Sequence, residues 1–406
     1  MSELARLRAK FGIDALALLP FQGEGLQYVN EAKDFGPSIG GVRTLEAGKT
    51  YFVIGDIDLQ GDRLEAGGVV TLLGTSSETS SITSTGLDAS TPLLTSRYTI
   101  PVRFITFKDV GTGIYIDDNA GANAPLAIDW LGVNFLNVTT IGEVGTIDNF
   151  VYDTGAFLSS QGLSFTGTIG TAALSNSLFQ GDGSAANIIE IASTVVFTRR
   201  FRIIYSSVVA FGSSVGLNVN ASATIPIEGY ILDTVNFSGG GTYTSGVGFG
   251  DNKVRWDNNR GIQNSAAISN YFMNGNATAT TITVIGAEVK VSGTTTSATI
   301  TQKFTNTDNR ATYTGAIQRD FKVSAVFSVE SGNNNEVGAY IAKNGTVIPS
   351  SEIYVTTNAG GRAEAGICQT IVDLTQDDYI EVFVENNSST TNVVMTELNV
   401  ILEALN

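Results

Sequence analysis

The sequence contains no histidine among its 406 residues and a single cysteine, Cys368. The lack of histidine excludes histidine-based catalytic triads, histidine metal ligands and the commonest general base. The single cysteine excludes an intrachain disulfide and a cysteine metal cluster. Cys368 ends the apolar run 365–368, which predicts a buried structural thiol. We therefore expect neither a metal nor a cofactor.

Charge is also scarce. Charged residues make up only 15% of the chain, and the net charge is −16. An acidic surface repels phosphate groups, so we expect no nucleic-acid partner and no anionic lipid partner over most of the surface. No apolar run reaches the length of a transmembrane span, and we expect no membrane insertion.

Glycine, by contrast, is abundant at 45 residues, and hydrophobic residues make up 42% of the chain. That hydrophobic content excludes a disordered chain. From about residue 41, short apolar runs such as 50–54, 69–73 and 104–107 alternate with glycine, asparagine or aspartate. This pattern predicts an all-β protein rich in tight turns.

Several of the apolar runs contain a phenylalanine, and successive phenylalanines lie roughly 14 to 32 residues apart. A coil of a parallel β-helix uses about that many residues, so we expect one strand per coil to stack its phenylalanine on the previous one. Strands stacked about 4.8 Å apart would form a continuous core. A series of β-sandwiches is the alternative. The phenylalanines expected to stack are Phe107, Phe135, Phe165, Phe179, Phe211 and Phe237.

The first residues contain the best helix candidate. Leu4, Leu7 and Phe11 fall at spacings of three and four, which predicts a short amphipathic helix within residues 1–40. Either this helix caps the following domain, or it anchors the chain by bundling with sister chains or docking on a larger particle. Asp14 interrupts the apolar patch, Pro20 ends it, and no small-residue cleavage site follows, so we expect no signal peptide.

The pattern of the sequence changes near residue 270. Apolar residues recur at every second position in 321–329 and 380–384, which predicts half-buried strands. Asn344-Gly345 lies between the runs 337–343 and 346–348, and this dipeptide between strands is a strong hairpin signal. A last strand is expected over 394–402. Together these patterns predict an antiparallel jelly roll over residues 271–406.

Three segments of this region, 340–345, 377–386 and 392–400, resemble the jelly rolls of tumour-necrosis-factor or complement-globular type at the ends of bacteriophage fibres. The resemblance implies a tight homotrimer. Residues 41–265 are similar to the pectate-lyase-like β-helices of phage tailspikes, chiefly through 50–73 and 75–82. We thus expect an all-β chain with a helical anchor over 1–40, a right-handed parallel β-helix over 41–270, and a jelly roll over 271–406.

The resemblance, the missing export signal and the absence of disulfides together imply a bacteriophage virion component, assembled in the host cytoplasm and released by lysis. We expect a trimeric fibre or spike on the tail or capsid, attached to other virion proteins through its N-terminal segment. Its role would be contact with a host-surface glycan or receptor. The alternative is a tailspike depolymerase that cleaves a surface polysaccharide in a β-helix groove.

Glycoside hydrolysis needs two carboxyl groups about 5 to 9.5 Å apart. Side chains in register on adjacent coils lie one strand spacing apart, so carboxylate pairs are the candidate catalytic groups. Asp117 and Asp118 lead the candidates, but solvated turn carboxylates are the simpler interpretation, and no catalytic residue is assigned. The other acidic candidates are Asp129, Asp153, Asp182, Glu190 and Asp233. Aromatic residues that could stack on sugars are Trp130, Tyr152, Tyr205, Tyr243 and Trp256, most of which we expect in the core.

Two further groups of charged residues invite a functional interpretation. Asp56, Asp58 and Asp62 suggest a bound cation, but their spacing does not match an EF-hand, and a solvated strand face is the alternative. On a strand, Asp56 and Asp58 would share one face and Ile57 and Leu59 the other. A basic cluster could pair with a neighbouring chain or meet an anionic host glycan. It comprises Arg199, Arg200 and Arg202, with Arg103 and Lys108 elsewhere.

Overall fold

The computed structural model describes residues 25–118, 127–248, 251–358 and 362–405. These residues form strands and two short 3-10 helices, η2 (Ala32–Phe35) and η3 (Pro349–Ser351), but no α-helix. The helix expected at Leu4, Leu7 and Phe11 lies outside the described residues. The chain divides between Phe165 and Thr166 into two compact units, with residues 180–182 belonging to the first.

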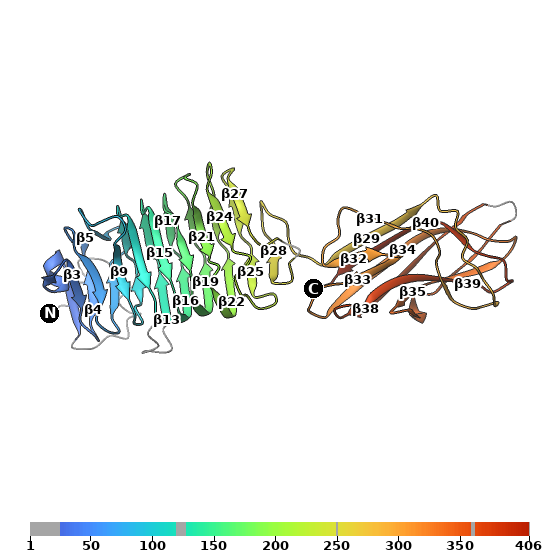
Figure 1. Cartoon of the computed structure of the whole chain (residues 1–406), viewed down its shortest axis with the longest axis horizontal. Helices are drawn as coiled ribbons and strands as arrows, with labels where there is room; N and C mark the ends of the chain where they lie inside the picture. The colour runs from blue at the N-terminus through green and yellow to red at the C-terminus, as the bar shows by residue number, and fades with distance from the viewer. Residues whose placement is uncertain (1–24, 119–126, 249–250, 359–361, 406) are drawn as a thin grey trace, which may run out of the picture. The chain divides into compact units, whose positions relative to one another are not determined.

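Three sheets built mainly of parallel strands make up a β-solenoid, because successive coils contribute one strand to each sheet in turn (Figure 1). The first solenoid sheet contains, in order, β1 (Leu26–Val29), β4 (Thr50–Val53), β7 (Thr71–Gly74), β10 (Val102–Arg103), β13 (Ala127–Leu131), β16 (Ile147–Asp153), β19 (Thr168–Ser175), β22 (Val196–Ile204), β25 (Tyr230–Asp233) and β28 (Val254–Asp257). The second contains β5 (Gly55–Asp58), β8 (Ser80–Thr83), β11 (Thr106–Lys108), β14 (Asn134–Leu136), β17 (Ala156–Leu158), β20 (Leu178–Gln180), β23 (Ser207–Val209) and β26 (Asn236–Ser238). The third contains β2 (Ser38–Ile39), β3 (Val42–Leu45), β6 (Arg63–Ala66), β9 (Pro92–Ser96), β12 (Thr112–Ile116), β15 (Thr140–Val144), β18 (Leu163–Phe165), β21 (Asn187–Ile191), β24 (Val215–Val219) and β27 (Thr242–Ser245).

The parallel pairing begins before residue 41. β1 already pairs with β4, so the first rung of the solenoid lies within the predicted anchor segment 1–40. The pair β2–β3 in the third sheet is antiparallel. The antiparallel sheets of the jelly roll begin with β29 (Ile268–Asn274). The functional assignment of the three segments stays a prediction.

A phenylalanine stack runs through the second solenoid sheet. Phe107 pairs with Phe135, and Phe135 with Phe157, and both pairs of ring centres lie 5.6 Å apart. The stack was predicted, but two of its members were wrong. Phe165 lies on β18 in the third sheet, and Phe211 lies outside the strands and is 40% exposed. The prediction failed because coil length varies, so that spacing alone does not fix the register.

The corner between the first and second solenoid sheets has a repeated backbone conformation. From β10 onward, one residue per coil adopts a positive φ there, at intervals of 22 to 29 residues. A left-handed residue turns the chain sharply, which lets a short strand follow directly. Only one of these residues is glycine, and the others accept the strain. The corner residues are Phe104, Gly132, Thr154, Asn176, Tyr205, Thr234 and Asn258.

Large aromatic residues fill the solenoid interior. Trp130, Tyr152 and Trp256 are all at most 2% exposed, so three of the five proposed sugar-stacking residues belong to the core. The Trp130 indole N–H donates to the Ile100 carbonyl at 2.9 Å, and the Tyr152 hydroxyl donates to the Val133 carbonyl at 2.6 Å. These bonds satisfy the polar atoms that burial would otherwise leave without a partner.

The residues after 267 fold into two antiparallel sheets with jelly-roll pairing. Of the eight principal strands, the first pairs with the eighth, the second with the seventh, the third with the sixth and the fourth with the fifth. This is a long hairpin folded onto itself, the arrangement of a jelly roll. In chain order the strands are β29, β33 (Arg310–Tyr313), β34 (Arg319–Glu330), β35 (Glu336–Lys343), β37 (Ile353–Thr356), β38 (Glu364–Leu374), β39 (Tyr379–Asn386) and β40 (Val394–Ala404).

Short strands extend both sheets. The five-stranded sheet has the order β31-β29-β40-β34-β38, with β31 (Thr296–Ser297) at its edge. The seven-stranded sheet has the path β32-β33-β39-β35-β36, while β30 pairs with β39 and β37 with β35. The added strands of this sheet are β30 (Val289–Lys290), β32 (Phe304–Thr307) and β36 (Thr346–Val347). The predicted all-β chain, a parallel β-helix followed by an antiparallel jelly roll, is confirmed.

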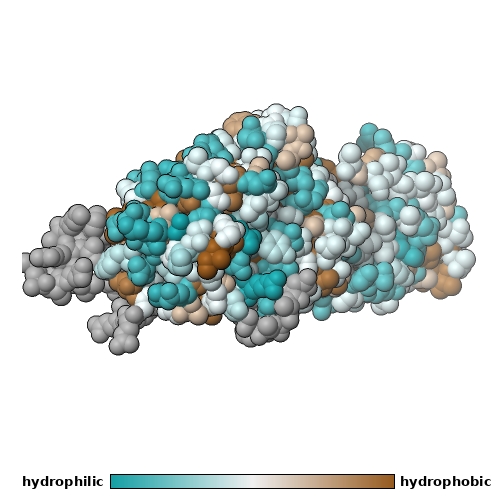
Figure 2. Space-filling view, turned by 60° about the vertical axis from the view of Figure 1, so that its left-hand side comes forward, coloured by the Kyte–Doolittle hydropathy of each residue, from teal (hydrophilic) through white to brown (hydrophobic). Residues whose placement is uncertain are grey.

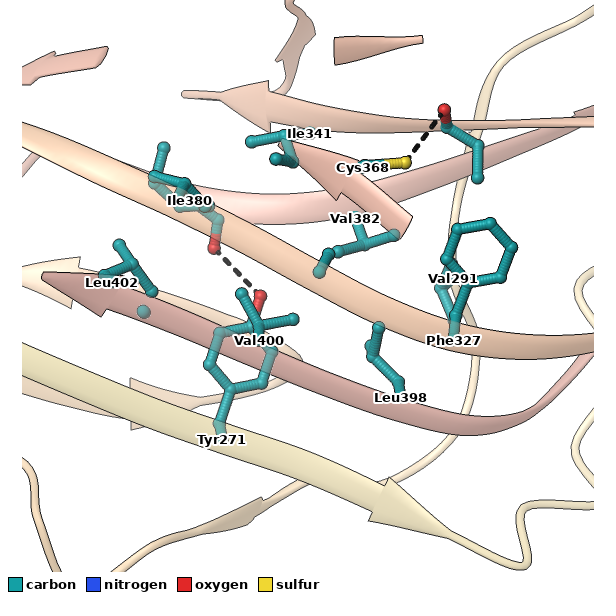
Figure 3. Close-up of a cluster of buried hydrophobic side chains, with 14 of the residues drawn as sticks. Tyr271, Val291, Phe327, Ile341, Cys368, Ile380, Val382, Leu398, Val400 and Leu402 are labelled. Carbon is teal, nitrogen blue, oxygen red and sulfur yellow. Dashed lines mark hydrogen bonds between the residues drawn. The ribbon is translucent and has the colours of Figure 1, made fainter. Parts of the chain in front are cut away.

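The jelly-roll core comes from the two inward faces, as the alternating apolar residues predicted. Phe321, Val323 and Ala325 on β34 are 0% exposed and belong to the same buried cluster as Ile380 and Val384 on β39. Figure 3 shows part of this cluster, including Phe327, Ile380 and Val382. The thiol of Cys368 lies in the same cluster and donates to the Ala339 carbonyl at 3.3 Å. The prediction of a buried thiol is therefore confirmed.

The predicted Asn344-Gly345 turn connects β35 to β36. Both residues have positive φ, 53° and 77°. This is the backbone of a tight two-residue hairpin, which explains the choice of asparagine and glycine. The Asn344 side chain also donates to Asp378 at 2.6 Å, tying the turn to the segment before β39.

Candidate functional site

A polar groove lies on the outward side of the third solenoid sheet. Glu65, Thr95, Tyr115 and Glu143 are directly in register on β6, β9, β12 and β15, so one row of side chains crosses four coils. A cavity of about 480 Å³ opens at this row. We call it the Tyr115 groove. Its lining residues are Arg63, Glu65, Ala66, Gly67, Thr95, Ser96, Arg97, Tyr98 and Tyr115.

Asp117 supports Tyr115 in this groove. One Asp117 carboxylate oxygen accepts from the Thr146 backbone N–H at 2.8 Å, and the other accepts from the Tyr115 hydroxyl at 3.2 Å. Burial raises the pKa of Tyr115, as do the negative charges of Asp117 and Glu143, while the Arg97 guanidinium acts in the opposite direction. The groove thus brings a phenol, an arginine and carboxylates together.

The two leading catalytic candidates are not solvated turn residues. Asp117 is 8% exposed and Asp118 is 6% exposed. The Asp118 backbone N–H donates to the Thr146 carbonyl at 3.2 Å, and its Oδ1 accepts no hydrogen bond from the part of the chain that the structure describes. Asp117 holds Tyr115 and the neighbouring coil in place. A catalytic role for either carboxylate stays a prediction.

A carboxylate pair that the sequence reasoning missed lies on the first solenoid sheet. Asp233 on β25 is in register with Asp257 on β28, so the two residues are one strand spacing apart, about 4.8 Å. Asp257 accepts from the Arg255 Nε–H at 3.0 Å, and Asp233 accepts from the Asn258 side chain at 3.3 Å. Both carboxylates line a cavity of about 510 Å³ together with Glu228, Arg255, Asn258, Ile317, Gln318 and Arg319.

The corner pattern is the signal that could have found this pair. Asp153, Asp233 and Asp257 each come directly before the left-handed corner residue of their coil. They therefore occupy the same position in the repeat. Of the remaining acidic candidates, Asp129 forms an ion pair with Arg103 at 2.9 Å, Asp182 is exposed, and Glu190 is in register with Asn218.

Two proposed sugar-stacking residues remain outside the core. Tyr205 occupies one of the corners and is 60% exposed. Tyr243 is partly buried, and its ring centre lies 6.0 Å from that of Phe237. Neither residue lines one of the cavities described above.

The three aspartates considered for a cation have separate partners. Asp56 accepts from the Ser81 hydroxyl at 2.5 Å, Asp58 from the Thr85 backbone N–H at 2.8 Å, and Asp62 pairs with Arg43 at 2.8 Å. The predicted alternation is confirmed, since Ile57 and Leu59 are buried on the opposite face. Among the described residues, no group of three or more histidine, cysteine or acidic side chains could hold a metal ion.

The three arginines of the basic cluster on β22 differ in their exposure to solvent. Arg199 and Arg200 are exposed and Arg202 is partly buried. The Arg199 Nε–H donates to the Thr171 hydroxyl at 3.1 Å. Arg103 and Lys108 form ion pairs within the chain, with Asp129 and Asp56 respectively.

The outward side of the five-stranded jelly-roll sheet carries exposed aliphatic residues. Val326 and Ile367 are direct cross-strand neighbours on β34 and β38, 48% and 47% exposed. Ile371 on β38 is 66% exposed, and Ile401 on β40 is 38% exposed. We call these four residues the exposed aliphatic face. A hollow of about 440 Å³ lined by Phe272, Val326 and Ala365 adjoins it.

Elsewhere, the surface shown in Figure 2 is largely hydrophilic or near neutral, and hydrophobic residues appear on it as separate patches. The four residues of the exposed aliphatic face lie on one side of one sheet, and Val326 and Ile367 are in register there. No helix of the described residues is long and apolar enough to cross a membrane.

Comparison with known proteins finds no matching protein family and no matching curated protein. Among solved structures, murine APRIL at pH 5.0 is 7% identical with a TM-score of 0.26, covering 34% of this chain and 98% of its own. The vertex protein P5 of PRD1 is 10% identical with a TM-score of 0.25, covering 34% of this chain and 96% of its own. The enzymatically active domain of tailspike protein 4 from bacteriophage CBA120 is 10% identical with a TM-score of 0.26, covering 91% of this chain and 69% of its own. Similarities this low carry no argument about function, and the fold rests on the strand pairing itself.

Proposed function

We propose that the chain is a homotrimeric fibre or spike of a bacteriophage virion that contacts the host cell surface. The exposed aliphatic face is the observation that supports this function best. Four aliphatic side chains on one antiparallel sheet, 38% to 66% exposed, would gain stability by being covered. The partner we propose is a second copy of this chain.

Charge on the same face supports self-association. Lys322 lies directly opposite Glu403 on β40 and Ile371 on β38. Glu397 is also exposed on β40. A surface that carries both signs beside aliphatic residues is complementary to a copy of itself.

The virion assignment rests on the resemblance of the two domains to phage fibres and tailspikes. The N-terminal segment would attach the trimer to other virion proteins, and assembly would take place in the host cytoplasm. The jelly roll and the solenoid surface would then present repeated contacts to the cell. A protein that contacts the cell through its shape and its repeated surface does not need to catalyse a reaction.

The self-association proposal is tested by substituting one residue of the exposed aliphatic face. Ile371→Asp places a charge where the proposed interface is apolar, so light scattering should show dissociation toward the monomer mass. Ile227→Asp is the matched control, because Ile227 is 57% exposed but lies outside the jelly roll. Equal masses for both variants and the parent would refute this interface.

The Asp233–Asp257 pair favours a second candidate function, cleavage of a surface polysaccharide. A separation near one strand spacing falls close to the 5–5.5 Å typical of retaining glycoside hydrolases. The test is release of reducing ends from capsular polysaccharide and lipopolysaccharide preparations. Product formation that Asp257→Asn abolishes, with Asp129→Asn as control, would support cleavage. If none of the preparations yields product, cleavage is refuted and the structural role is the one that remains.

A further inference from the structure

In the described part of the first unit, every lysine and arginine side chain except one forms an ion pair, and the exception lines the Tyr115 groove. The first unit has seven lysine and arginine residues in its described part, and six form ion pairs with a carboxylate of the same unit. Arg97 is the seventh, and no ion pair joins it to the described residues. It is exposed, at the wall of a cavity of about 480 Å³. In a chain of net charge −16, an arginine without a carboxylate partner is conspicuous.

We propose that the Tyr115 groove binds an acidic glycan, with Arg97 receiving the carboxylate of a uronic acid unit. This inference deepens the proposed host contact and rests on it. A guanidinium matches a carboxylate with two parallel N–H donors, which makes arginine the residue of choice for this group. Arg63 lines the same groove but is already paired with Glu65 at 3.2 Å.

Two tyrosines flank Arg97 and provide apolar surface for a sugar ring. Tyr115 is 37% exposed at the centre of the row that crosses four coils. Tyr98 follows Arg97 directly and is fixed by Ser96, whose hydroxyl accepts from the Tyr98 N–H at 3.1 Å and donates to its carbonyl at 2.8 Å. Pockets of this composition, aromatic with a few oriented polar groups, are typical of small-ligand sites.

The surrounding carboxylates restrict which acidic glycan fits. Glu65 lines the groove, Glu143 acts on Tyr115 from the next coil, and Asp117 acts on it from just beyond the end of β12. They can accept hydrogen bonds from sugar hydroxyls, but they repel further negative charge. The groove therefore suits one uronate flanked by neutral sugars, rather than an uninterrupted polyuronate.

Calorimetric titration of the full-length protein with three defined oligosaccharides tests the proposal. The probes are a hyaluronan oligomer, in which glucuronate alternates with a neutral amino sugar, an oligogalacturonate of equal length, and a neutral dextran oligomer. We expect the hyaluronan oligomer to bind best, and its affinity to fall as salt is added, because salt screens the exposed ion pair. Equal affinity for the neutral oligomer, or no binding of the hyaluronan oligomer, would overturn the proposal.

Substitution of Arg97 ties the binding to the groove. Loss of a charged hydrogen-bonding partner weakens affinity by about ten- to a hundredfold, so Arg97→Gln should show that loss. Arg97→Lys keeps the charge without the planar fork and should fall between. The matched control is Arg200→Gln, an exposed arginine on the first solenoid sheet, which should bind like the parent. Unchanged affinity in Arg97→Gln would refute the site.

The outcome is separable from that of the proposed function. Adsorption of the protein to host cells and its trimer mass test the spike assignment. If both persist while Arg97→Gln leaves glycan affinity unchanged, the groove proposal fails and the spike remains. If the parent protein is monomeric and does not adsorb to cells, the spike assignment fails whatever the titration shows.

Discussion

Glu228 within the second unit holds two cations, one of which is almost fully buried. Its Oε1 lies 3.4 Å from the Lys303 Nζ and also pairs with Arg319. The Lys303 side chain is 2% exposed, and its other polar contact is the Val254 carbonyl at 3.3 Å. Burial lowers the pKa of Lys303, and the negative charge of Glu228 opposes that shift. The ammonium group is therefore stable inside the protein only while Glu228 is charged.

Replacing Glu228 by glutamine should be strongly destabilising. It leaves the Lys303 ammonium buried without a counter-charge, and removing one partner of a buried ion pair costs about 3–5 kcal/mol. Lys303→Met should cost about 1 kcal/mol or less, because Glu228 then retains Arg319. The double variant should recover the part of the loss that comes from the buried Lys303 ammonium, while the part that comes from Arg319, which also pairs with Glu228, should remain.

The pH dependence gives a second test of the same reasoning. The folded pKa of Lys303 lies below its unfolded value, so the unfolded chain binds more protons between the two values. Stability should accordingly rise with pH in that window, and more steeply in Glu228→Gln than in the parent. Urea unfolding at fixed protein concentration measures both effects, with Trp256 fluorescence as the probe of the adjacent coil. A loss below about 1 kcal/mol in Glu228→Gln, or no recovery in the double variant, would refute the account.

Three further substitutions or treatments probe other parts of the fold. Phe135→Ala should lower the unfolding free energy by about 3–5 kcal/mol through a core cavity, whereas Phe211→Ala, at a 40% exposed residue, should be nearly neutral in the same urea titration. Gly345→Ala should cost about 1–2 kcal/mol because its φ is 77°, while Gly248→Ala, where an added Cβ meets nothing within 4 Å, should not. Burial raises the pKa of Cys368 to about 12, so a thiol reagent at neutral pH should label it only after unfolding, and labelling of the native protein would contradict its buried position.

The jelly roll was predictable because its strands bury one face. The period-two pattern over 321–329 identifies the side chains that reach the core, and Asn344-Gly345 marks a turn that needs positive φ. The exposed aliphatic face was not predicted. Val326 falls out of phase with the buried residues of β34, and nothing in the sequence pairs it with Ile367, some 40 residues later. Cross-strand register supplies that information.

The solenoid was predictable as a class, but its register was not. Coils of 22 to 29 residues differ mainly in their turns, so phenylalanine spacing misplaced Phe165 and Phe211. The left-handed corner residues are the better landmark, and they align Asp233 with Asp257. The Tyr115 groove shows the same difficulty, since Arg63, Arg97 and Tyr115 come from successive coils. Only stacking brings them together.

The central claim is that this chain works as a homotrimer built on its jelly roll. Light scattering of the purified protein, coupled to size-exclusion chromatography, measures this directly. We expect three times the chain mass of 42.7 kDa, with the mass falling toward that of one chain in Ile371→Asp. A single species at 42.7 kDa for the parent protein would contradict it.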